Sequence, residues 1–255
     1  MNKLNICHTH LPETSSTNNA ARDLPFGESF CTEGILNVIS TDYQTAGRGQ
    51  RGNTWESAPN KNLLFSLSLY PDELPSSRQF VICELISVIL CEVLSRYTEG
   101  IHIKWPNDIY HHNHKLCGIL IEHDIEGSHI TRSIIGVGIN VNQTHFTSNA
   151  PNPISLYQIL GHETDREELL SAICETIATS PLLTSPSKEE YTILHHRYIS
   201  MLYRRDVPAD YRDANGKFTA TLRDVSPDGL LTLEDLQGKL RSYLFKEITF
   251  IVNTQ

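Results

Sequence analysis

Two arginines lie within a six-residue glycine-rich segment, Gly47-Arg48-Gly49-Gln50-Arg51-Gly52. Glycine makes this backbone pliable, and guanidinium groups pair well with carboxylates and phosphates, so the segment is suited to closing around an anionic ligand. The spacing also satisfies G-x-G-x-x-G, but dinucleotide binding requires a helix that opens at the last glycine. Residues 53–60 have no helical pattern, so we interpret the segment as an arginine-bearing anion loop, with a solvated surface loop as the alternative.

A second group of polar residues, Lys104-Trp105-Pro106-Asn107-Asp108, follows a predicted strand. The proline removes a backbone donor and forces an extended turn, which places an amide and a carboxylate at the strand end. Lys115 begins the next strand, and a hairpin of this length returns it beside Asn107 and Asp108. Each residue alone has an ordinary structural explanation. Together with the arginine loop, they favour a pocket for an anion.

The elements that must position these groups are readable from periodicity and capping residues. Thr14-Ser15-Ser16-Thr17-Asn18 supplies N-cap residues to a short helix, and residues 76–97 have the apolar spacing of one long helix. Later helices are predicted from capping boxes at Thr164/Glu167 and Ser187/Glu190. Strands are predicted at residues 35–40, 63–69, 101–105, 115–122 and 130–138, the last three forming an antiparallel meander.

Beyond Arg205 the pattern changes to short strands separated by turns. These strands are predicted at residues 218–225, 230–234, 240–245 and 248–252, and a small β-barrel is their natural packing. We therefore predict an α+β fold with two domains. Residues 1–204 form a mixed or antiparallel sheet packed with helices, and residues 205–255 form the small terminal barrel.

Composition excludes several function classes. The formal net charge is -9, which argues against general nucleic-acid binding because that depends on clustered lysine and arginine. The first eight residues lack the apolar core of a signal peptide, and the apolar stretch Phe80 to Leu94 is interrupted by Glu84 and Glu92. We expect a cytoplasmic protein that does not enter membranes.

Cysteine and histidine spacing does not favour a transition-metal site. The six cysteines are scattered without any C-x-x-C pair, which is typical of buried reduced thiols. The tract His111-His112-Asn113-His114 lies between two strand-like runs, where such polar residues more often form a hairpin turn than a metal site.

The chain resembles the biotin protein ligases, the enzymes that attach biotin to carboxylase carrier domains. Five segments occur in family order: Ser15-Ser16-Thr17-Asn18, Gln44-Thr45-Ala46-Gly47-Arg48-Gly49, Lys104-Trp105-Pro106-Asn107-Asp108, Lys115-Leu116-Cys117-Gly118-Ile119-Leu120 and Gly136-Val137-Gly138-Ile139-Asn140-Val141-Asn142. The resemblance implies a class II synthetase-like catalytic domain followed by a small SH3-like barrel. Ligand-contacting segments begin within the first twenty residues, so it also implies the monofunctional type, without a DNA-binding domain.

The resemblance implies a two-step reaction. Biotin and ATP give biotinyl-5'-AMP and pyrophosphate, and a lysine of a biotin carboxyl carrier protein, such as that of acetyl-CoA carboxylase, then attacks the mixed anhydride. A carboxylate that attacks a triphosphate must overcome repulsion between anions, and Arg48 and Lys115 would supply the opposing charge. Asp108 would either hold Mg2+ on the phosphates or receive the proton of the incoming lysine, and we expect it to be essential.

The resemblance also assigns binding roles to individual residues. Those implied to bind biotin are Ser16, Thr17, Asn18, Gln44, Gly47, Arg48, Gly49, Gln50, Lys115, Gly118, Leu120 and Gly136. The nucleotide would contact Arg48, Arg51, Trp55, Asn107, Lys115 and Asn140, with Trp55 as an apolar lid; core packing is the alternative for Trp55. The ureido ring needs matched donors and acceptors once it is desolvated, which the polar residues of the first set supply.

The chain departs from the family pattern at one loop position, and two alternative functions remain. Some family members have an arginine where this chain has Gln50, so retention of the intermediate would depend more on Arg48 and Arg51. A lipoate ligase of the same fold is the nearest alternative, and a non-catalytic module that binds biotin or a carrier domain is another. The presence of Lys115, Arg48 and Asp108 favours an active biotin ligase. An edge strand of the central sheet would allow a homodimer, which the sequence neither requires nor excludes.

Overall fold

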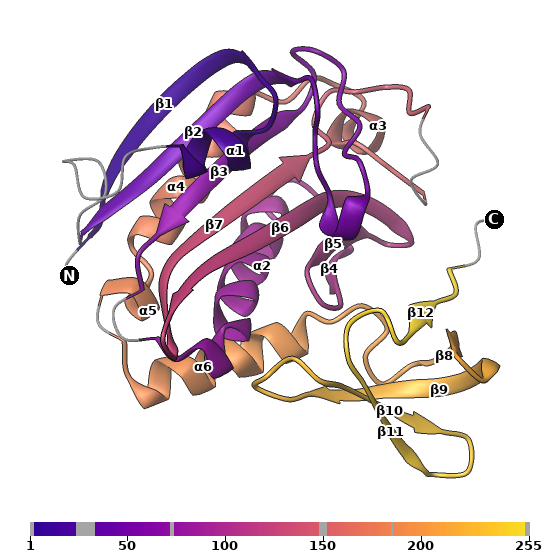
Figure 1. Cartoon of the computed structure of the whole chain (residues 1–255). Coiled ribbons are helices and arrows are strands. Elements are labelled where there is room, and N and C mark those ends of the chain that lie inside the picture. The colour runs from indigo at the N-terminus through magenta and orange to yellow at the C-terminus, as the bar shows by residue number, and fades with distance from the viewer. Residues whose placement is uncertain (1–2, 24–33, 72–73, 148–151, 185, 253–255) are drawn as a thin grey trace.

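The computed structural model describes all residues except 1–2, 24–33, 72–73, 148–151, 185 and 253–255 (Figure 1). Its larger part is a seven-stranded sheet in the order β1-β2-β3-β7-β6-β5-β4. From one edge to the other, the strands span Asn5–Thr14, Ile35–Gln44, Leu63–Leu69, His129–Ile139, His114–Glu126, Asp108–His111 and Ile101–Lys104. The last four pair antiparallel, so the predicted three-stranded meander is confirmed, and it gains a fourth strand, Asp108–His111, that was not predicted.

Strand β1 was not predicted from the sequence. It pairs in parallel with β2 and lies at the edge of the sheet, where most of its residues are exposed or half-buried. An edge strand of this kind need not carry an apolar pattern, because little of it is buried. Its parallel pairing with β2 sets the direction in which the chain enters α1 (Thr17–Arg22).

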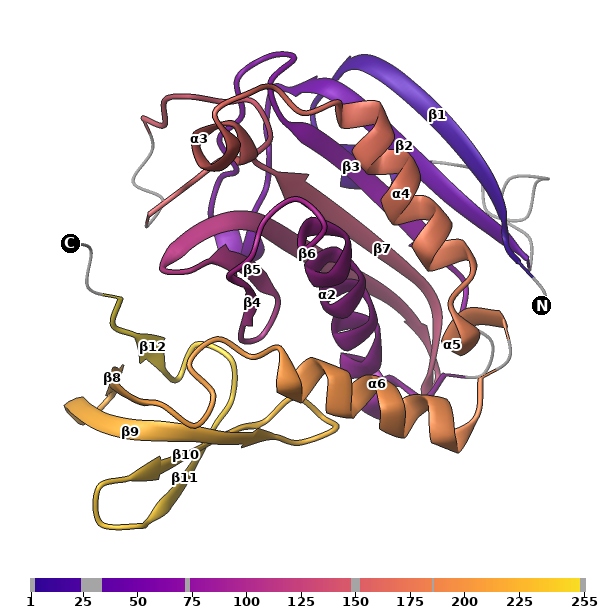
Figure 2. The same ribbon diagram turned by 180° about the vertical axis from the view of Figure 1, so that it is seen from behind.

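Strand β3 was predicted from alternating apolar residues, but all seven of its residues are buried. The reason is that both faces of the sheet are covered at this point. Helix α1 lies against one face, and helices α2 (Phe80–Leu94) and α4 (Arg166–Ala178) lie across the other, as Figures 1 and 2 show. The serines of β3 are therefore buried beneath α1.

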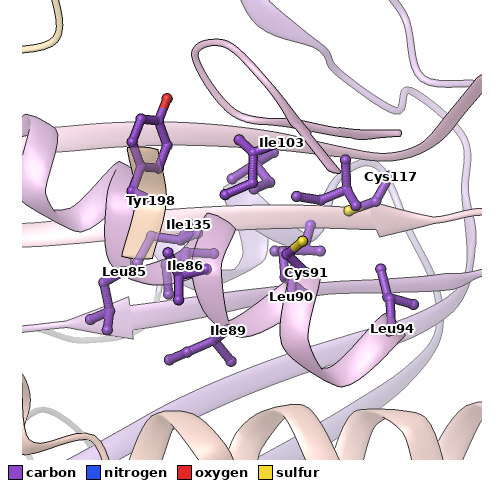
Figure 3. Packing of buried hydrophobic residues seen from close by; sticks show 14 of the residues in the cluster. Leu85, Ile86, Ile89, Leu90, Cys91, Leu94, Ile103, Cys117, Ile135 and Tyr198 are labelled. Atoms are coloured by element: carbon purple, nitrogen blue, oxygen red, sulfur yellow. The ribbon is translucent and has the colours of Figure 1, made fainter. Parts of the chain in front are cut away.

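Helix α2 confirms the long helix predicted after Ser76, and a 3-10 turn at Ser76–Arg78 precedes it. It is buried on nearly all sides because the sheet covers one face and helices cover the others. Figure 3 shows Ile86 and Leu90 of α2 near side chains of the sheet such as Ile135 and Cys117, which belong to the same core cluster. Within the described part of the chain, every helix falls short of the length and apolarity that crossing a bilayer requires.

The predicted helix starts were confirmed at one position and displaced at another. Ser187 caps α6 (Lys188–Ser200), and its hydroxyl accepts a hydrogen bond from the Glu190 amide. The cap of α4 is Asp165 and not Thr164, because the longer reach of a carboxylate satisfies two amide groups at once. Two short helices were missed, α3 (Leu156–Leu160) and α5 (Pro181–Thr184).

The smaller part of the chain is a five-stranded sheet in the order β11-β10-β9-β8-β12. In that order the strands span Leu240–Tyr243, Leu231–Asp235, Gly216–Val225, Pro208–Asp213 and Thr249–Phe250, and β8 was not predicted. The expected closure into a barrel is not confirmed, because no pairing joins β11 to β12 among the described residues. Figure 2 shows this sheet beside α6 and below the β4–β5 hairpin.

The cysteine and histidine expectations can be checked for the described residues. Cys83, Cys91, Cys117 and Cys174 are buried thiols, Cys7 is half-buried, and none of these five forms a disulfide; Cys31 lies outside the described residues. His111 to His114 forms the turn between β5 and β6, as predicted. The described residues contain no cluster of three or more histidine, cysteine or acidic side chains that could hold a metal ion.

Candidate active site

The predicted site residues converge on one open cavity of about 170 Å³. The start of α1, the arginine loop, the turn between β4 and β5, and the adjoining parts of β6 and β7 form its walls. The described residues that line it are Ser16, Thr17, Asn18, Gln44, Arg48, Gly49, Gln50, Asn53, Thr54, Trp55, Lys104, Trp105, Pro106, Asn107, Asp108, Lys115, Gly118, Ile119, Leu120, Gly136, Val137, Gly138 and Phe245. Segments far apart in sequence thus meet at one place.

Lys115 and Asp108 form an ion pair inside this cavity, with the lysine Nζ 2.7 Å from Oδ1 of the carboxylate. Both side chains are about three-quarters buried. The pairing of β5 with β6 brings them together, as the hairpin length predicted, and a register shift after Ile109 sets the final offset. Asn107 lies beside them, and its amide nitrogen donates to the Ile119 carbonyl at 3.0 Å.

Arg48 lines the cavity with a partly exposed side chain and is paired with Glu122, its Nη2 being 3.1 Å from Oε2 of the carboxylate. The same oxygen accepts a hydrogen bond from Asn18 Nδ2 at 2.8 Å. Glu122 thus joins the arginine loop to the start of α1. With Lys115 on the same cavity, two cations face the region where an anionic ligand would enter.

The residues predicted to read a ureido ring lie around the start of α1. Ser16 occupies the N-cap position, but its side chain makes no capping hydrogen bond. Gln44 Oε1 accepts from the Thr17 amide at 2.8 Å, so the end of β2 and the start of α1 are held together. Ser16, Thr17 and Asn18 are each almost fully buried, which makes unmatched ligand groups costly there.

Trp55 lies across two glycines of the cavity floor. A Cβ atom at Gly118 would approach the tryptophan ring to 2.7 Å, and one at Gly138 to 2.5 Å. Gly136 makes similar room for Asn18, whose Oδ1 would lie 2.2 Å from a Cβ. The space at these glycines is therefore filled by the protein's own side chains. Trp55 is half-buried and outside the main core cluster, which favours the cavity-wall role over core packing.

Three predicted site residues do not line the cavity or cannot be assessed. Gly47 supports the loop from behind, because its carbonyl accepts from the Trp55 amide at 3.0 Å. Asn140 is buried, and its side-chain amide donates to the Ile154 carbonyl at 3.1 Å. The side chain of Arg51 lies outside the described part of the chain. The remaining predicted residues all line the cavity.

A model of the biotin/lipoate A/B protein ligase family matches residues 14–140. The chain is also 30% identical over 242 residues to the bifunctional ligase/repressor BirA of Bacillus subtilis strain 168, covering 90% of this chain and 70% of that protein. The chain belongs to this ligase family. All of the cavity-lining segments except the one that contributes Phe245 fall inside the matched range.

Other family members extend this likeness. The biotin--[acetyl-CoA-carboxylase] ligase of Paracoccus denitrificans is 29% identical over 174 residues, covering 66% of this chain and 70% of that protein. The structure of a biotin protein ligase from Aquifex aeolicus in complex with biotin and ATP superimposes with a TM-score of 0.77 at 25% identity. It covers 98% of this chain and 99% of its own.

Two further residues, Lys104 and Phe245, belong to the site, although neither was predicted to have a role there. Lys104 lines the cavity, with its Nζ 5.0 Å from the centre of the Phe250 ring. Burial lowers the pKa of Lys104, and the nearby Asp108 carboxylate opposes that shift. Phe245 reaches the cavity from the smaller sheet. The motif that contains Lys104 was the available signal, whereas no sequence signal marked Phe245.

The smaller sheet and the core also hold the turn that carries Asp108. Trp105 Nε1 donates to the Gly229 carbonyl at 3.1 Å, and its ring packs edge-on against Phe245. The Pro106 carbonyl accepts from the Tyr198 hydroxyl at 2.7 Å and from the Cys83 thiol at 3.4 Å. Burial raises the pKa of both donor groups, so each keeps the proton it donates.

Proposed function

We propose that this protein activates biotin with ATP and transfers it to a lysine of a biotin carboxyl carrier domain, such as that of acetyl-CoA carboxylase. The observation that carries the proposal is the convergence of Arg48, Lys115 and Asp108 on one cavity beside the buried polar start of α1. It is supported by the Aquifex aeolicus ligase that binds biotin and ATP, and by the Paracoccus denitrificans ligase named for acetyl-CoA carboxylase.

In the first step, a carboxylate oxygen of biotin attacks the α-phosphorus of ATP. The new P–O bond forms as the bond to the bridging oxygen breaks, so biotinyl-5'-AMP forms and pyrophosphate leaves with the extra negative charge. Lys115 and Arg48 stabilise this charge because both are already positioned at the cavity. A preorganised cation needs no reorientation during the reaction, which is why its removal is costly.

In the second step, the neutral amine of the acceptor lysine attacks the acyl carbon, and AMP leaves as the amide forms. The amine must lose a proton during this attack. Asp108 is the sole acidic residue among the described residues of the cavity lining, so it is the group available to receive that proton. Its ion pair with Lys115 holds the carboxylate in place at the cavity.

Mg2+ fits the same carboxylate. Magnesium is usually held by one or two carboxylates together with substrate phosphates and water, and Asp108 supplies one such ligand. Bound with ATP, the ion would neutralise part of the phosphate charge. Asp108 thus fits two roles, proton acceptor and Mg2+ ligand, and both predict a large loss of activity on its removal.

The finer organisation follows from the same proposal. Residues 1–204 form the catalytic domain and residues 205–255 the family's small SH3-like barrel, which contributes Phe245 to the cavity. The net charge of -9 accords with a cytoplasmic enzyme that acts on small molecules and a carrier domain. The two edge strands of the larger sheet, β1 and β4, are where two copies would pair in a homodimer.

The experiment that tests the function is ATP–pyrophosphate exchange with biotin compared with lipoate. The family description covers both ligase types. The buried hydroxyl and amide groups at the start of α1 match a ureido ring, which has donors and an acceptor, better than a dithiolane ring, which has no N–H donor. We expect exchange with biotin at least 100-fold faster than with lipoate. Equal or reversed rates would overturn the proposal.

A further inference from the structure

Five polar side chains form a continuous hydrogen-bonded row, and three of them also line the cavity. The row runs from Gln44 through Thr17, Ser66 and Asn18 to Glu122. Thr17 Oγ1 lies 3.2 Å from Gln44 Oε1 and 2.7 Å from Ser66 Oγ. Ser66 Oγ lies 2.6 Å from Asn18 Oδ1, and Asn18 Nδ2 lies 2.8 Å from Glu122 Oε2.

Ser66 is the central member of this polar row and has no contact with the cavity itself. It lies on β3, is fully buried, and is absent from the cavity lining, whereas Thr17 and Asn18 on either side of it line the cavity. Any effect of Ser66 on a ligand must therefore pass through those two neighbours. Ser66 lies outside the five sequence motifs, so the sequence alone did not point to it.

The hydrogen directions along the row follow from its charged end. The Glu122 carboxylate is paired with Arg48 and can only accept, so Asn18 must turn its NH2 group toward it. The Asn18 carbonyl oxygen then faces Ser66 and can only accept, which commits the single proton of the Ser66 hydroxyl.

The same reasoning determines the direction of the hydrogen bond made by the hydroxyl of Thr17, which lines the cavity. Because the Ser66 proton is committed to Asn18, the Thr17 hydroxyl proton is shared between two acceptors inside the protein, Ser66 Oγ at 2.7 Å and Gln44 Oε1 at 3.2 Å. The Thr17 hydroxyl has then spent its only proton inside the protein. Toward the cavity, Thr17 Oγ1 can only accept a hydrogen bond, so the ligand group that faces it must be a donor.

We propose that Ser66 is a positioning residue which, together with Glu122, commits the Thr17 hydroxyl to accept from a ureido N–H of the ligand. This inference rests on the proposed function, since it explains how the site selects biotin. The physical cost of a mismatch is that of a buried polar group left unpaired, because Thr17, Ser66 and Asn18 are almost fully buried.

The first test compares Ser66→Ala with a matched control on the same strand. Ser68 lies two residues along β3 on the same face, is equally buried, and its hydroxyl has no hydrogen-bond partner among the described residues. We expect S66A to raise the KM for biotin about tenfold and to leave the KM for ATP within about twofold. We expect S68A to change neither constant.

The second measurement compares the KM of a biotin analogue with the KM of biotin, a ratio that a purely structural role of Ser66 would not change. In cyclic carbamate analogues of biotin, an oxygen replaces one ureido N–H, so an acceptor faces Thr17. The wild type should have a higher KM for the analogue in which oxygen replaces the ureido N–H that faces Thr17. In S66A the Thr17 hydroxyl keeps only its longer contact, 3.2 Å to Gln44 Oε1, so it is freer to turn and donate to the ligand, and the ratio of the analogue KM to the biotin KM should fall several-fold. An unchanged ratio would overturn the proposal.

Glu122→Gln provides a second variant that leaves the buried serine in place, which keeps the test valid if S66A folds poorly. A glutamine can donate as well as accept, so Asn18 is no longer held in one orientation and the same ratio should fall. Asp124→Asn is the control, because Asp124 lies two residues further on β6 and pairs with Arg22 and Arg132 instead. We expect it to leave the ratio unchanged.

Failure of this inference and failure of the proposed function give different results. A wild-type protein with no biotin-dependent exchange of pyrophosphate overturns both. Normal exchange in the wild type, combined with equal biotin KM values and equal analogue ratios for S66A and S68A, overturns the positioning role alone.

Discussion

The cavity and the smaller sheet carry the same kinds of ion pair but differ in what surrounds them. In the smaller sheet, Arg241 pairs with Asp235 at 2.9 Å and Arg223 pairs with Glu234 at 2.6 Å. At the cavity, Lys115 pairs with Asp108 at 2.7 Å. The distances are alike, so pairing geometry does not mark function. What distinguishes Lys115 is that its partner and its neighbours face a cavity that a ligand can enter.

The largest expected effect is a loss of activity that distinguishes the ion pair at the cavity from the one in the smaller sheet. Lys115→Gln should slow biotin-dependent ATP–pyrophosphate exchange by at least about 100-fold, because it removes a preorganised cation from the reacting phosphate. Circular dichroism should show an unchanged fold. Arg241→Gln is the matched control and should leave exchange unchanged, since its ion pair lies on the smaller sheet away from the cavity. Near-normal exchange in K115Q would contradict the assigned role.

The next effect concerns retention of the activated intermediate. Arg48→Gly should let biotinyl-5'-AMP escape, because the loop loses the cation that faces the cavity. Labelling of an unrelated protein such as serum albumin, detected with streptavidin, should rise about tenfold or more relative to the wild type. Arg223→Gln, which alters an arginine of the smaller sheet, should not raise it. Unchanged selectivity in R48G would refute the proposed role of the loop.

A smaller effect is expected from two buried tyrosines, one in each region. Tyr198→Phe removes the donor to the Pro106 carbonyl and should lower the free energy of unfolding by about 1 kcal/mol, with a several-fold lower kcat. Tyr211 is equally buried in the smaller sheet, but its hydroxyl has no partner among the described residues. Tyr211→Phe should therefore be neutral or stabilising. Urea unfolding checks both, and equal destabilisation would contradict the assignment.

The smallest effect concerns pH. Hydrogen bonds from Lys217 and Thr219 lower the pKa of Asp210 in the smaller sheet. The folded state therefore binds the proton less readily than the unfolded state, so this stabilisation is present above the ordinary aspartate pKa and is lost as the pH falls through the lowered value. The stability difference between the wild type and Asp210→Asn should shrink below about pH 4. Urea unfolding from pH 7 to 2.5 measures it, and a constant difference would count against the shift.

Local features could be predicted from the sequence because they depend on nearby residues. Ser187 caps α6 because its amide partner lies three residues away. Lys115 returns to Asp108 because a short hairpin has few ways to close. Even locally, competition between neighbours decided one outcome, since Asp165 and not Thr164 caps α4. Strands β1 and β8 were missed because strands whose residues are mostly exposed or half-buried carry a weak apolar pattern.

The sequence by itself determined which chemical groups were available and which hairpin would bring Lys115 to Asp108. Only the tertiary structure decided that Ser66 would meet Asn18 and that Arg48 would meet Glu122, because these contacts depend on the order in which β3, β7 and β6 pair. The tertiary structure also gave the Asn140 side chain a partner in the Ile154 carbonyl, and the packing of the smaller sheet against the β4–β5 turn brought Phe245 to the cavity. Contacts between distant residues require the whole fold, since no local pattern specifies which strands become neighbours.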